Sequence, residues 1–204
     1  MRLLLSVLGA LAILGAPVLH AEDWAGVIKA LDKSIAYVQG ESGACTAFVI
    51  NVEKKYLLTA AHCHQKDIWV DRVQAKVISL DTKKDLMVLQ AENLDPARVA
   101  LKLAAKNPAR GQAVMSAGFG YALERPFFRQ ANVQDDAFML PEGGVGGPYI
   151  SVDSSFVGGQ SGGPVVNIAG EVVSIVQRGD GGTTGLGVGV EIIRERVGRF
   201  FNAK

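Results

Sequence analysis

The chain has few of the residues that build metal and redox sites, with two cysteines and three histidines among 204 residues. Aromatic residues are also scarce, at 7% of the chain. No charge of one sign dominates, because 21 Lys and Arg stand against 20 Asp and Glu. A chain so close to neutral offers no electrostatic surface for nucleic acid or for anionic lipid, so neither is expected as a partner.

Long apolar runs are lacking after the N-terminus. The one such run, residues 3–14, follows Arg2 and precedes a segment that ends at Ala21, an order typical of a secretory signal peptide. We expect cleavage near Ala21, a single domain over residues 22–204, and a periplasmic or secreted bacterial protein. Leu19 stands where a small residue is preferred, so an uncleaved membrane anchor is the alternative. If the signal is cleaved, no stable membrane partner is expected.

The two cysteines, Cys45 and Cys63, would meet an oxidising compartment after export and are expected to form a disulfide. Closing a loop of this size stabilises a fold by about 2–4 kcal/mol. Two free buried thiols are the alternative. No metal is expected, because the cysteines and His64 do not have the spacing of a zinc site.

Short segments rich in branched and aromatic residues recur along the chain between polar or glycine-rich turns, which is typical of strands. They cover residues 35–38, 46–52, 56–59, 68–70, 74–78 and 86–90, and then 112–119, 129–134, 149–152, 164–166, 172–177 and 187–190. This rhythm predicts two barrel-like halves. A short helix capped by Asp23 is expected through residue 31, and a closing helix from residue 191.

Residues 158–164, with the sequence GGQSGGP, carry the strongest single motif and indicate Ser161 as a nucleophile. Flanking glycines allow a sharp turn that exposes the hydroxyl and brings backbone N–H groups together. The nucleophile elbow of α/β-hydrolases also reads Gly-x-Ser-x-Gly, but there the histidine follows the serine. All three histidines of this chain precede Ser161, which excludes that fold.

A serine nucleophile needs a base, and the base needs a carboxylate to orient it. His62 lies where an apolar segment ends in small residues, and Asp85 begins the apolar segment that follows it in the chain. Taken alone, His62 could be an ordinary partly buried histidine and Asp85 a solvated aspartate. His64, Asp71 and Asp81 are weaker candidates, because their sequence surroundings are less suitable.

In this order, TAAHC at 59–63, DLMVL at 85–89 and GQSGGP at 159–164 resemble the trypsin/chymotrypsin-like serine endopeptidases. Residues 111–114, 161–167 and 170–172 look most like the bacterial HtrA-type branch, here without a PDZ domain. The resemblance implies an all-β fold of two six-stranded antiparallel β-barrels with a short N-terminal helix and a C-terminal helix. It also implies hydrolysis of peptide bonds in protein or peptide substrates without a cofactor. It predicts no particular oligomeric state.

By this resemblance, His62, Asp85 and Ser161 form a catalytic triad that acts through an acyl-enzyme, and the N–H groups of Gly159 and Ser161 form the oxyanion hole. The residues implied to bind substrate are Ser155 at the bottom of the specificity pocket, Gln177, Arg178 and Gly179 along its side, and Gly187 at its wall. With no acid at the base, the pocket favours an apolar side chain before the scissile bond. Asp153 is the nearby acid that could reverse this preference.

Gln160 stands where zymogen-activated digestive relatives have an acid that pairs with a newly cut N-terminus. The chain also has no start resembling Ile-Val-Gly-Gly, so activation by N-terminal insertion is not expected. The alternative to an active endopeptidase is a catalytically silent or latent peptide-binding module. In the latent form, the Gly159 peptide would be flipped until a ligand or partner arrives.

Overall fold

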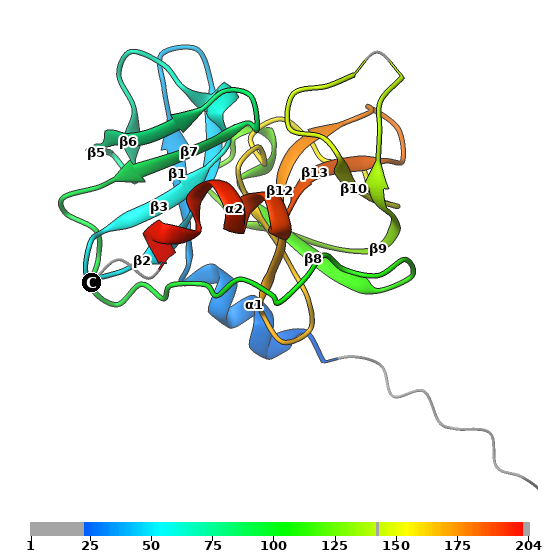
Figure 1. Cartoon of the computed structure of the whole chain (residues 1–204). Coiled ribbons are helices and arrows are strands. Elements are labelled where there is room, and N and C mark those ends of the chain that lie inside the picture. The colour runs from blue at the N-terminus through cyan, green and yellow to red at the C-terminus, as the bar shows by residue number, and fades with distance from the viewer. Residues whose placement is uncertain (1–22, 142, 202–204) are drawn as a thin grey trace, which may run out of the picture.

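The structure, a computed structural model, describes residues 23–141 and 143–201. Its strands form two halves that lie side by side (Figure 1). The predicted signal peptide, residues 1–21, lies outside the described residues. In the part of the chain that is described, no helix has the length and apolar character needed to cross a membrane.

The first half is a seven-stranded antiparallel sheet in the order β5-β4-β1-β2-β3-β7-β6. Its strands are β1 Ile35–Gln39, β2 Ala44–Asn51, β3 Tyr56–Thr59, β4 Trp69–Val70, β5 Val73–Gln74, β6 Lys76–Asp81 and β7 Leu86–Gln90. The two edge strands, β5 and β6, are separated by Ala75 alone. The sheet therefore curls so that both of its edges come from one stretch of chain.

This half differs in detail from the expected six-stranded barrel. The segment predicted as one strand, 74–78, is divided into two strands that pair with different neighbours. Trp69 of β4 pairs with Gln74 of β5, whereas Lys76 of β6 pairs with Gln90 of β7. Between them, the Ala75 N–H donates to the Ile68 carbonyl at 2.9 Å. The change of partner at Ala75 divides the strand and leaves an open, strongly curled sheet.

The second half is a closed six-stranded barrel, as expected, in the order β10-β13-β12-β11-β8-β9. Its strands are β8 Ala113–Gly118, β9 Phe127–Phe138, β10 Tyr149–Val152, β11 Pro164–Val166, β12 Val172–Gly179 and β13 Gly185–Gly189. The chymotrypsin-like fold that the sequence predicted is thus confirmed in its two-part, mainly β architecture.

Three buried apolar clusters hold this arrangement together. The first half encloses one that includes Ala47, Val49, Leu57, Met87 and Leu89. The barrel encloses another that includes Val114, Val133, Ile150, Val152, Phe156, Val165 and Val176. The largest, which we call the junction core, joins residues of both halves with residues of both helices, among them Leu31, Phe48, Leu86, Met115, Val188 and Ile193. Burial in the junction core therefore fixes one half against the other.

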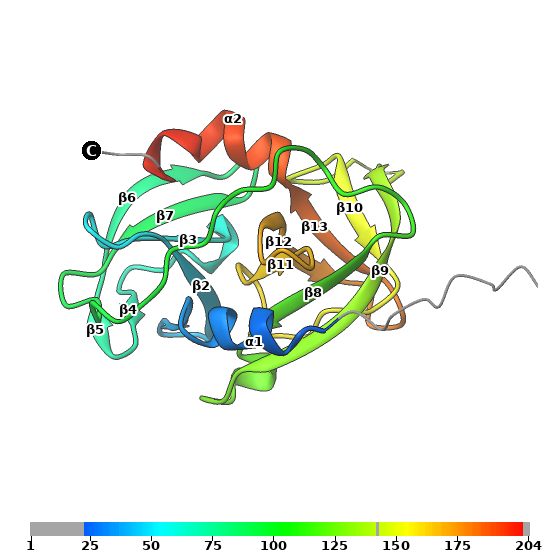
Figure 2. The ribbon, with the colours of Figure 1, turned by 90° about the horizontal axis from the view of Figure 1, so that it is seen from below.

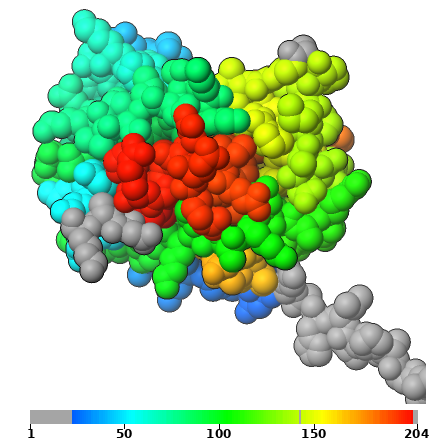
Figure 3. Space-filling model, in the orientation of Figure 1, coloured from blue at the N-terminus to red at the C-terminus, as the bar shows by residue number. Residues whose placement is uncertain are grey.

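The two predicted helices are present as α1 (Ala25–Asp32) and α2 (Val190–Phe201), on different sides of the molecule (Figure 2). The N-cap residue of α1 is Trp24 and not Asp23 as predicted, and Trp24 makes no side-chain cap. The Asp23 carboxylate, one residue earlier, accepts the Ala25 N–H at 2.9 Å. At the surface, α2 lies over the seam between the two halves (Figure 3). Arg196 of α2 forms an ion pair with Asp81 at 2.6 Å, which ties the helix to the end of β6.

Candidate active site

His62 lies in a short 3-10 turn, Ala61–Cys63, directly after β3. Its side chain is 44% exposed, so the imidazole borders solvent. The next residue, Cys63, is joined by the expected disulfide to Cys45 of β2. The bridge anchors the histidine turn to a strand of the sheet.

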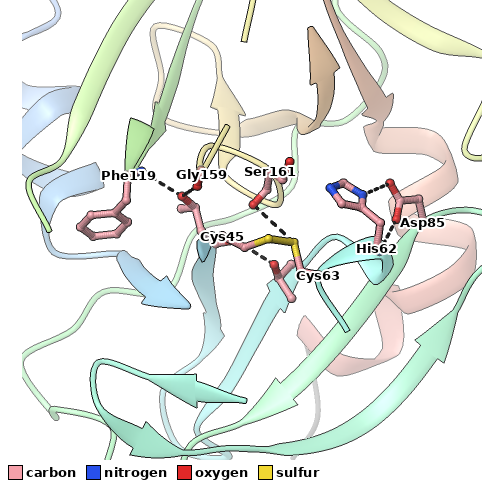
Figure 4. The surroundings of a disulfide bond; sticks show 9 residues. Cys45, His62, Cys63, Asp85, Phe119, Gly159 and Ser161 are labelled. Carbon is pink, nitrogen blue, oxygen red and sulfur yellow. Dashed lines mark hydrogen bonds and ion pairs between the residues drawn. A yellow bond between two sulfur atoms is a disulfide. The ribbon is translucent and has the colours of Figure 1, made fainter. Parts of the chain in front are cut away.

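Asp85 stands immediately before β7, and its side chain is only 2% exposed. One carboxylate oxygen accepts the backbone N–H of His62 and the other pairs with His62 Nδ1, both at 2.8 Å (Figure 4). The Asp85 backbone is left-handed, with φ of 56°, a conformation that aspartate enters more readily than most residues. A carboxylate accepts from Nδ1, and in the neutral form of the ring this leaves Nε2 as the acceptor.

Ser161 lies in the loop between β10 and β11 and comes from the second half of the fold. The Thr46 N–H, from the first half, donates to the Ser161 carbonyl at 2.8 Å. Figure 4 shows Ser161 between Gly159 and the His62–Asp85 pair. Over residues 23–141 and 143–201, no hydrogen bond joins Ser161 to His62. Such bonds are often long without substrate and tighten when it binds.

The peptide between Gly158 and Gly159 is held by a neighbouring loop. The Tyr121 N–H donates to the Gly158 carbonyl at 2.7 Å. In a planar trans peptide the N–H points opposite the carbonyl, so the Gly159 N–H points away from Tyr121. Gly159 has a φ of 94°, and a Cβ there would lie 2.2 Å from the Phe119 carbonyl oxygen. Only glycine fits this position.

The peptide between Gln160 and Ser161 is oriented in the same way, because the Gly163 N–H donates to the Gln160 carbonyl at 2.9 Å. The Ser161 N–H consequently points in the opposite direction. Within the described ranges, neither the Gly159 N–H nor the Ser161 N–H donates to a protein acceptor. Two backbone donors of the predicted oxyanion hole are therefore unoccupied beside the predicted nucleophile.

Thr46, which the sequence analysis did not single out, holds this loop from below. Its buried hydroxyl donates to the Gly159 carbonyl at 2.8 Å and accepts the Phe119 N–H at 2.9 Å. The only signal in the sequence was a polar residue next to Cys45 at the head of an apolar segment. Thr46 thus contacts the peptides of both Gly159 and Ser161.

Gln160 stands where zymogen-activated digestive relatives have an acid, and its side chain is fully buried. Its Oε1 accepts the Val157 N–H at 3.0 Å. Its Nε2 has no hydrogen-bond partner among the described residues. The glutamine side chain therefore bonds within its own loop.

A cavity of about 460 Å³ lies beside the His62–Asp85 pair and is lined by Ala61, His62, Thr82, Asp85, Val145, Gln177 and Arg178. Of the residues predicted to bind substrate, it includes Gln177 and Arg178 and not Ser155, Gly179 or Gly187. A Cβ on Gly187 would lie 2.2 Å from Ser174 Oγ, so this residue faces its neighbouring strand in the barrel. Of the predicted specificity residues, Gln177 and Arg178 thus line an open cavity, whereas Gly187 packs against a neighbouring strand.

Two acids lie near the predicted pocket in the sequence, and both are already engaged. The backbone N–H and the side-chain amide of Asn132, at 2.6 and 3.0 Å, hold the pKa of Asp153 below its ordinary value. The N–H groups of Gly182 and Thr184 lower the pKa of the exposed Asp180. The Asp153 carboxylate thus bonds to Asn132 of β9, and hydrogen bonds of this kind favour its ionised form.

Cys45, His62 and Cys63 bring potential metal-ligand atoms within 4.8 Å of one another. Both sulfurs are bonded to each other, however, so neither offers a thiolate. The disulfide therefore makes this cluster a structural anchor.

The sequence profile of the trypsin-like peptidase domain matches residues 45–175. Among curated proteins, none matches the chain in sequence. Solved structures share its fold. The active form of the Rv3671c protease from M. tuberculosis has a TM-score of 0.72 and 21% identity, over 87% of this chain and 85% of that one. The HtrA-type protease AlgW, solved with a tripeptide, has a TM-score of 0.73 and 20% identity, over 88% of this chain and 64% of AlgW.

Deg5 is similar as well, with a TM-score of 0.71 and 16% identity over 87% of this chain and 93% of that one. At such low identity the structures show a common fold, whereas the profile spans well over half of the chain. The similarity to an HtrA-type protease agrees with the predicted resemblance. The chain belongs to the trypsin-like peptidase domain family and is a serine endopeptidase.

Proposed function

We propose that this endopeptidase cleaves peptide bonds with a triad of His62, Asp85 and Ser161. The observation that carries the proposal is the paired contact of the buried Asp85 carboxylate with the N–H and Nδ1 of His62, both at 2.8 Å. A buried carboxylate in this position fixes the ring orientation and stabilises the imidazolium that forms during the reaction. The placement of the Ser161 loop beside this pair supports the same assignment.

In the proposed reaction, Ser161 Oγ attacks the scissile carbonyl carbon while His62 Nε2 accepts the hydroxyl proton. The N–H groups of Gly159 and Ser161 bind the resulting oxyanion. Collapse of the tetrahedral intermediate breaks the C–N bond, and His62 returns the proton to the leaving amine. Water then hydrolyses the acyl-enzyme by the same two steps. Apart from this water and the substrate, the side chains and amides named here are the only groups that these steps use.

We propose unfolded or exposed segments of proteins as substrates. His62 is 44% exposed and the neighbouring cavity opens beside it, so an extended chain can reach the site without a lid having to move. Export is part of the proposal and depends on residues 1–21 as a signal peptide.

The triad is tested by treating the purified protein with a fluorophosphonate and locating the adduct by mass spectrometry. We expect labelling at Ser161 that is lost in Ser161→Ala and His62→Ala. His64→Ala is the matched control, because His64 is the exposed histidine two residues away and should leave labelling unchanged. A folded protein that binds peptides but is neither labelled nor active would contradict the proposal and indicate a silent or latent module.

Export is tested separately by expressing the full chain in a bacterium and measuring the intact mass in the periplasmic fraction. The proposal expects a product that begins at Glu22. A full-length protein in the membrane fraction would instead indicate an uncleaved anchor.

A further inference from the structure

Gln177 and Arg178 are neighbours in β12, yet both line the cavity of the candidate active site. In a regular strand, the side chains of successive residues point to opposite faces of the sheet. Val176 pairs with Gly187 of β13, and Arg178 already pairs with Leu186, so Gln177 is the extra residue of a β-bulge. A bulge changes the direction of the side chains around it. The irregular pairing therefore explains how two successive side chains reach one cavity.

Hydrogen bonds hold the Arg178 side chain along one edge of its guanidinium. Its Nε donates to Gln177 Oε1 at 2.7 Å. Gln177 is 6% exposed, and its Nε2 donates to the Val145 carbonyl at 3.1 Å. The hydroxyl of the buried Tyr149 donates to the same carbonyl at 2.8 Å. Among the described residues, the two Nη groups of Arg178 have no acceptor, so they are left for a ligand.

The charge of Arg178 is not balanced by a neighbouring acid. In the part of the chain that the structure describes, the exposed Arg178 side chain forms no ion pair. The acid at the cavity, Asp85, is 2% exposed, and both of its oxygens bond to His62. The Asp180 carboxylate accepts two N–H groups of its own loop. An unpaired cation therefore lies at the same cavity as the proposed base.

The lining of the cavity matches a short apolar stem that ends in an anion. Ala61 and Val145 supply apolar contacts, and Arg178 supplies the cation. A guanidinium binds a carboxylate through two parallel hydrogen bonds, whereas a substrate lysine or arginine would meet a like charge. Because His62 lines the same cavity, the side chain that enters it belongs to a residue within about three of the scissile bond.

We propose that Arg178 determines specificity by binding the carboxylate of a substrate Asp or Glu close to the scissile bond. The inference rests on the proposed function, because it describes the substrate that Ser161 would cleave. It adds selection by charge to the apolar preference that the sequence predicted for the residue before the scissile bond.

The test first digests a peptide library with the purified protein and identifies the cleaved bonds by mass spectrometry, with Ser161→Ala as the blank. Asp and Glu should be enriched at one position near these bonds. Three peptides that differ only at this position, with Glu, Gln or Lys, then give kcat/KM for wild type, Arg178→Gln and Arg178→Glu. Arg110→Gln is the matched control, because Arg110 is an exposed arginine that does not line the cavity.

We expect the wild type to cleave the Glu peptide at least about threefold faster than the Gln peptide, the effect of one partly exposed ion pair. Arg178→Gln should bring this ratio to about one, and Arg178→Glu should favour the Lys peptide over the Glu peptide. Arg110→Gln should keep the wild-type ratio. Raising the salt from about 0.05 M to about 0.5 M should lower the wild-type ratio, because salt screens an exposed pair.

Three results would overturn the inference alone while Ser161-dependent cleavage persists. They are a library digest without acidic enrichment, equal wild-type rates with the Glu and Gln peptides, and a Glu preference retained by an Arg178→Gln protein that is folded by circular dichroism. Failure of the proposed function gives a different result. In that case the wild type and Ser161→Ala give the same digest, and both proposals fall together.

Discussion

Replacing Thr46 with valine tests whether the buried hydroxyl positions the oxyanion loop. Valine has the same shape, so the change removes two hydrogen bonds with little change in volume. It leaves the Gly159 carbonyl and the Phe119 N–H, now bonded at 2.8 and 2.9 Å, without their partner in a fully buried place. The N–H of Gly159, a proposed oxyanion donor, lies in the preceding peptide. A shift of this residue should therefore appear in the rate as well as in stability.

The stability cost follows from the two groups left unpaired. Each buried unsatisfied group costs about 1–3 kcal/mol, so the free energy of unfolding should fall by about 2–6 kcal/mol. Complete loss of one oxyanion donor lowers kcat by about 10²–10³. Thr46→Val moves the Gly159 donor without deleting it, so we expect a fall in kcat of about tenfold to a hundredfold with a nearly unchanged KM.

The assay combines urea unfolding with steady-state cleavage of a peptide. Thr46→Ser retains the hydroxyl and should restore most of kcat. Ser34→Ala is the matched control, because it removes a buried hydroxyl that donates to the Ala30 carbonyl of α1 at 2.7 Å and does not bond to the Ser161 loop. It should lower stability and preserve kcat. A folded Thr46→Val protein with wild-type kcat would refute the reasoning, as would a failure of serine to restore activity.

Three further changes have defined outcomes. Asp85→Asn should lower kcat by about 10⁴ at neutral pH while the protein remains folded, and a loss below tenfold would remove the carboxylate from the mechanism. Burial raises the pKa of Asp81, but Arg196 and the N–H groups of Lys84 and Lys83 together outweigh burial, so the net pKa is lowered. The stability that the Asp81 carboxylate contributes is therefore present above pH 4 and is lost as the pH falls further. Urea titrations of Asp81→Asn should therefore show less loss of stability from pH 6 to pH 3 than wild type, and an equal loss would show that the pair is not responsible. Removing the disulfide by Cys45→Ala with Cys63→Ala should lower the free energy of unfolding by about 3 kcal/mol, measured by urea unfolding, and a change below 1 kcal/mol would contradict the loop-closure estimate.

The parts of the fold that depend on local pattern could be predicted from the sequence. The strands around Leu57 and Leu89 are short apolar runs between polar turns, and they appear at the expected residues. Asp85 could be singled out because a buried carboxylate at the head of an apolar strand is costly unless it has a partner. Few structures satisfy both a local apolar pattern and the need of a buried carboxylate for a partner, so these features could be predicted from the sequence.

The features that could not be predicted depend on contacts between distant segments. Thr46 and Gly159 are 113 residues apart, and nothing near either residue reveals that the hydroxyl meets the carbonyl. Nothing near Phe156 in the sequence reveals that its ring packs against Gly185 of β13. The division of one expected strand at Ala75 depends on which neighbour each end of that segment finds, which is a tertiary property.

His62 and Asp85 lie in the first half of the fold, and Ser161 lies in the second, across the junction core. A chain that has been synthesised only through β7 contains the proposed base and its carboxylate but not the proposed nucleophile. A chain whose halves have both formed but have not yet docked has all three groups too far apart to react. Proteolysis by the proposed triad therefore requires that the two halves have docked.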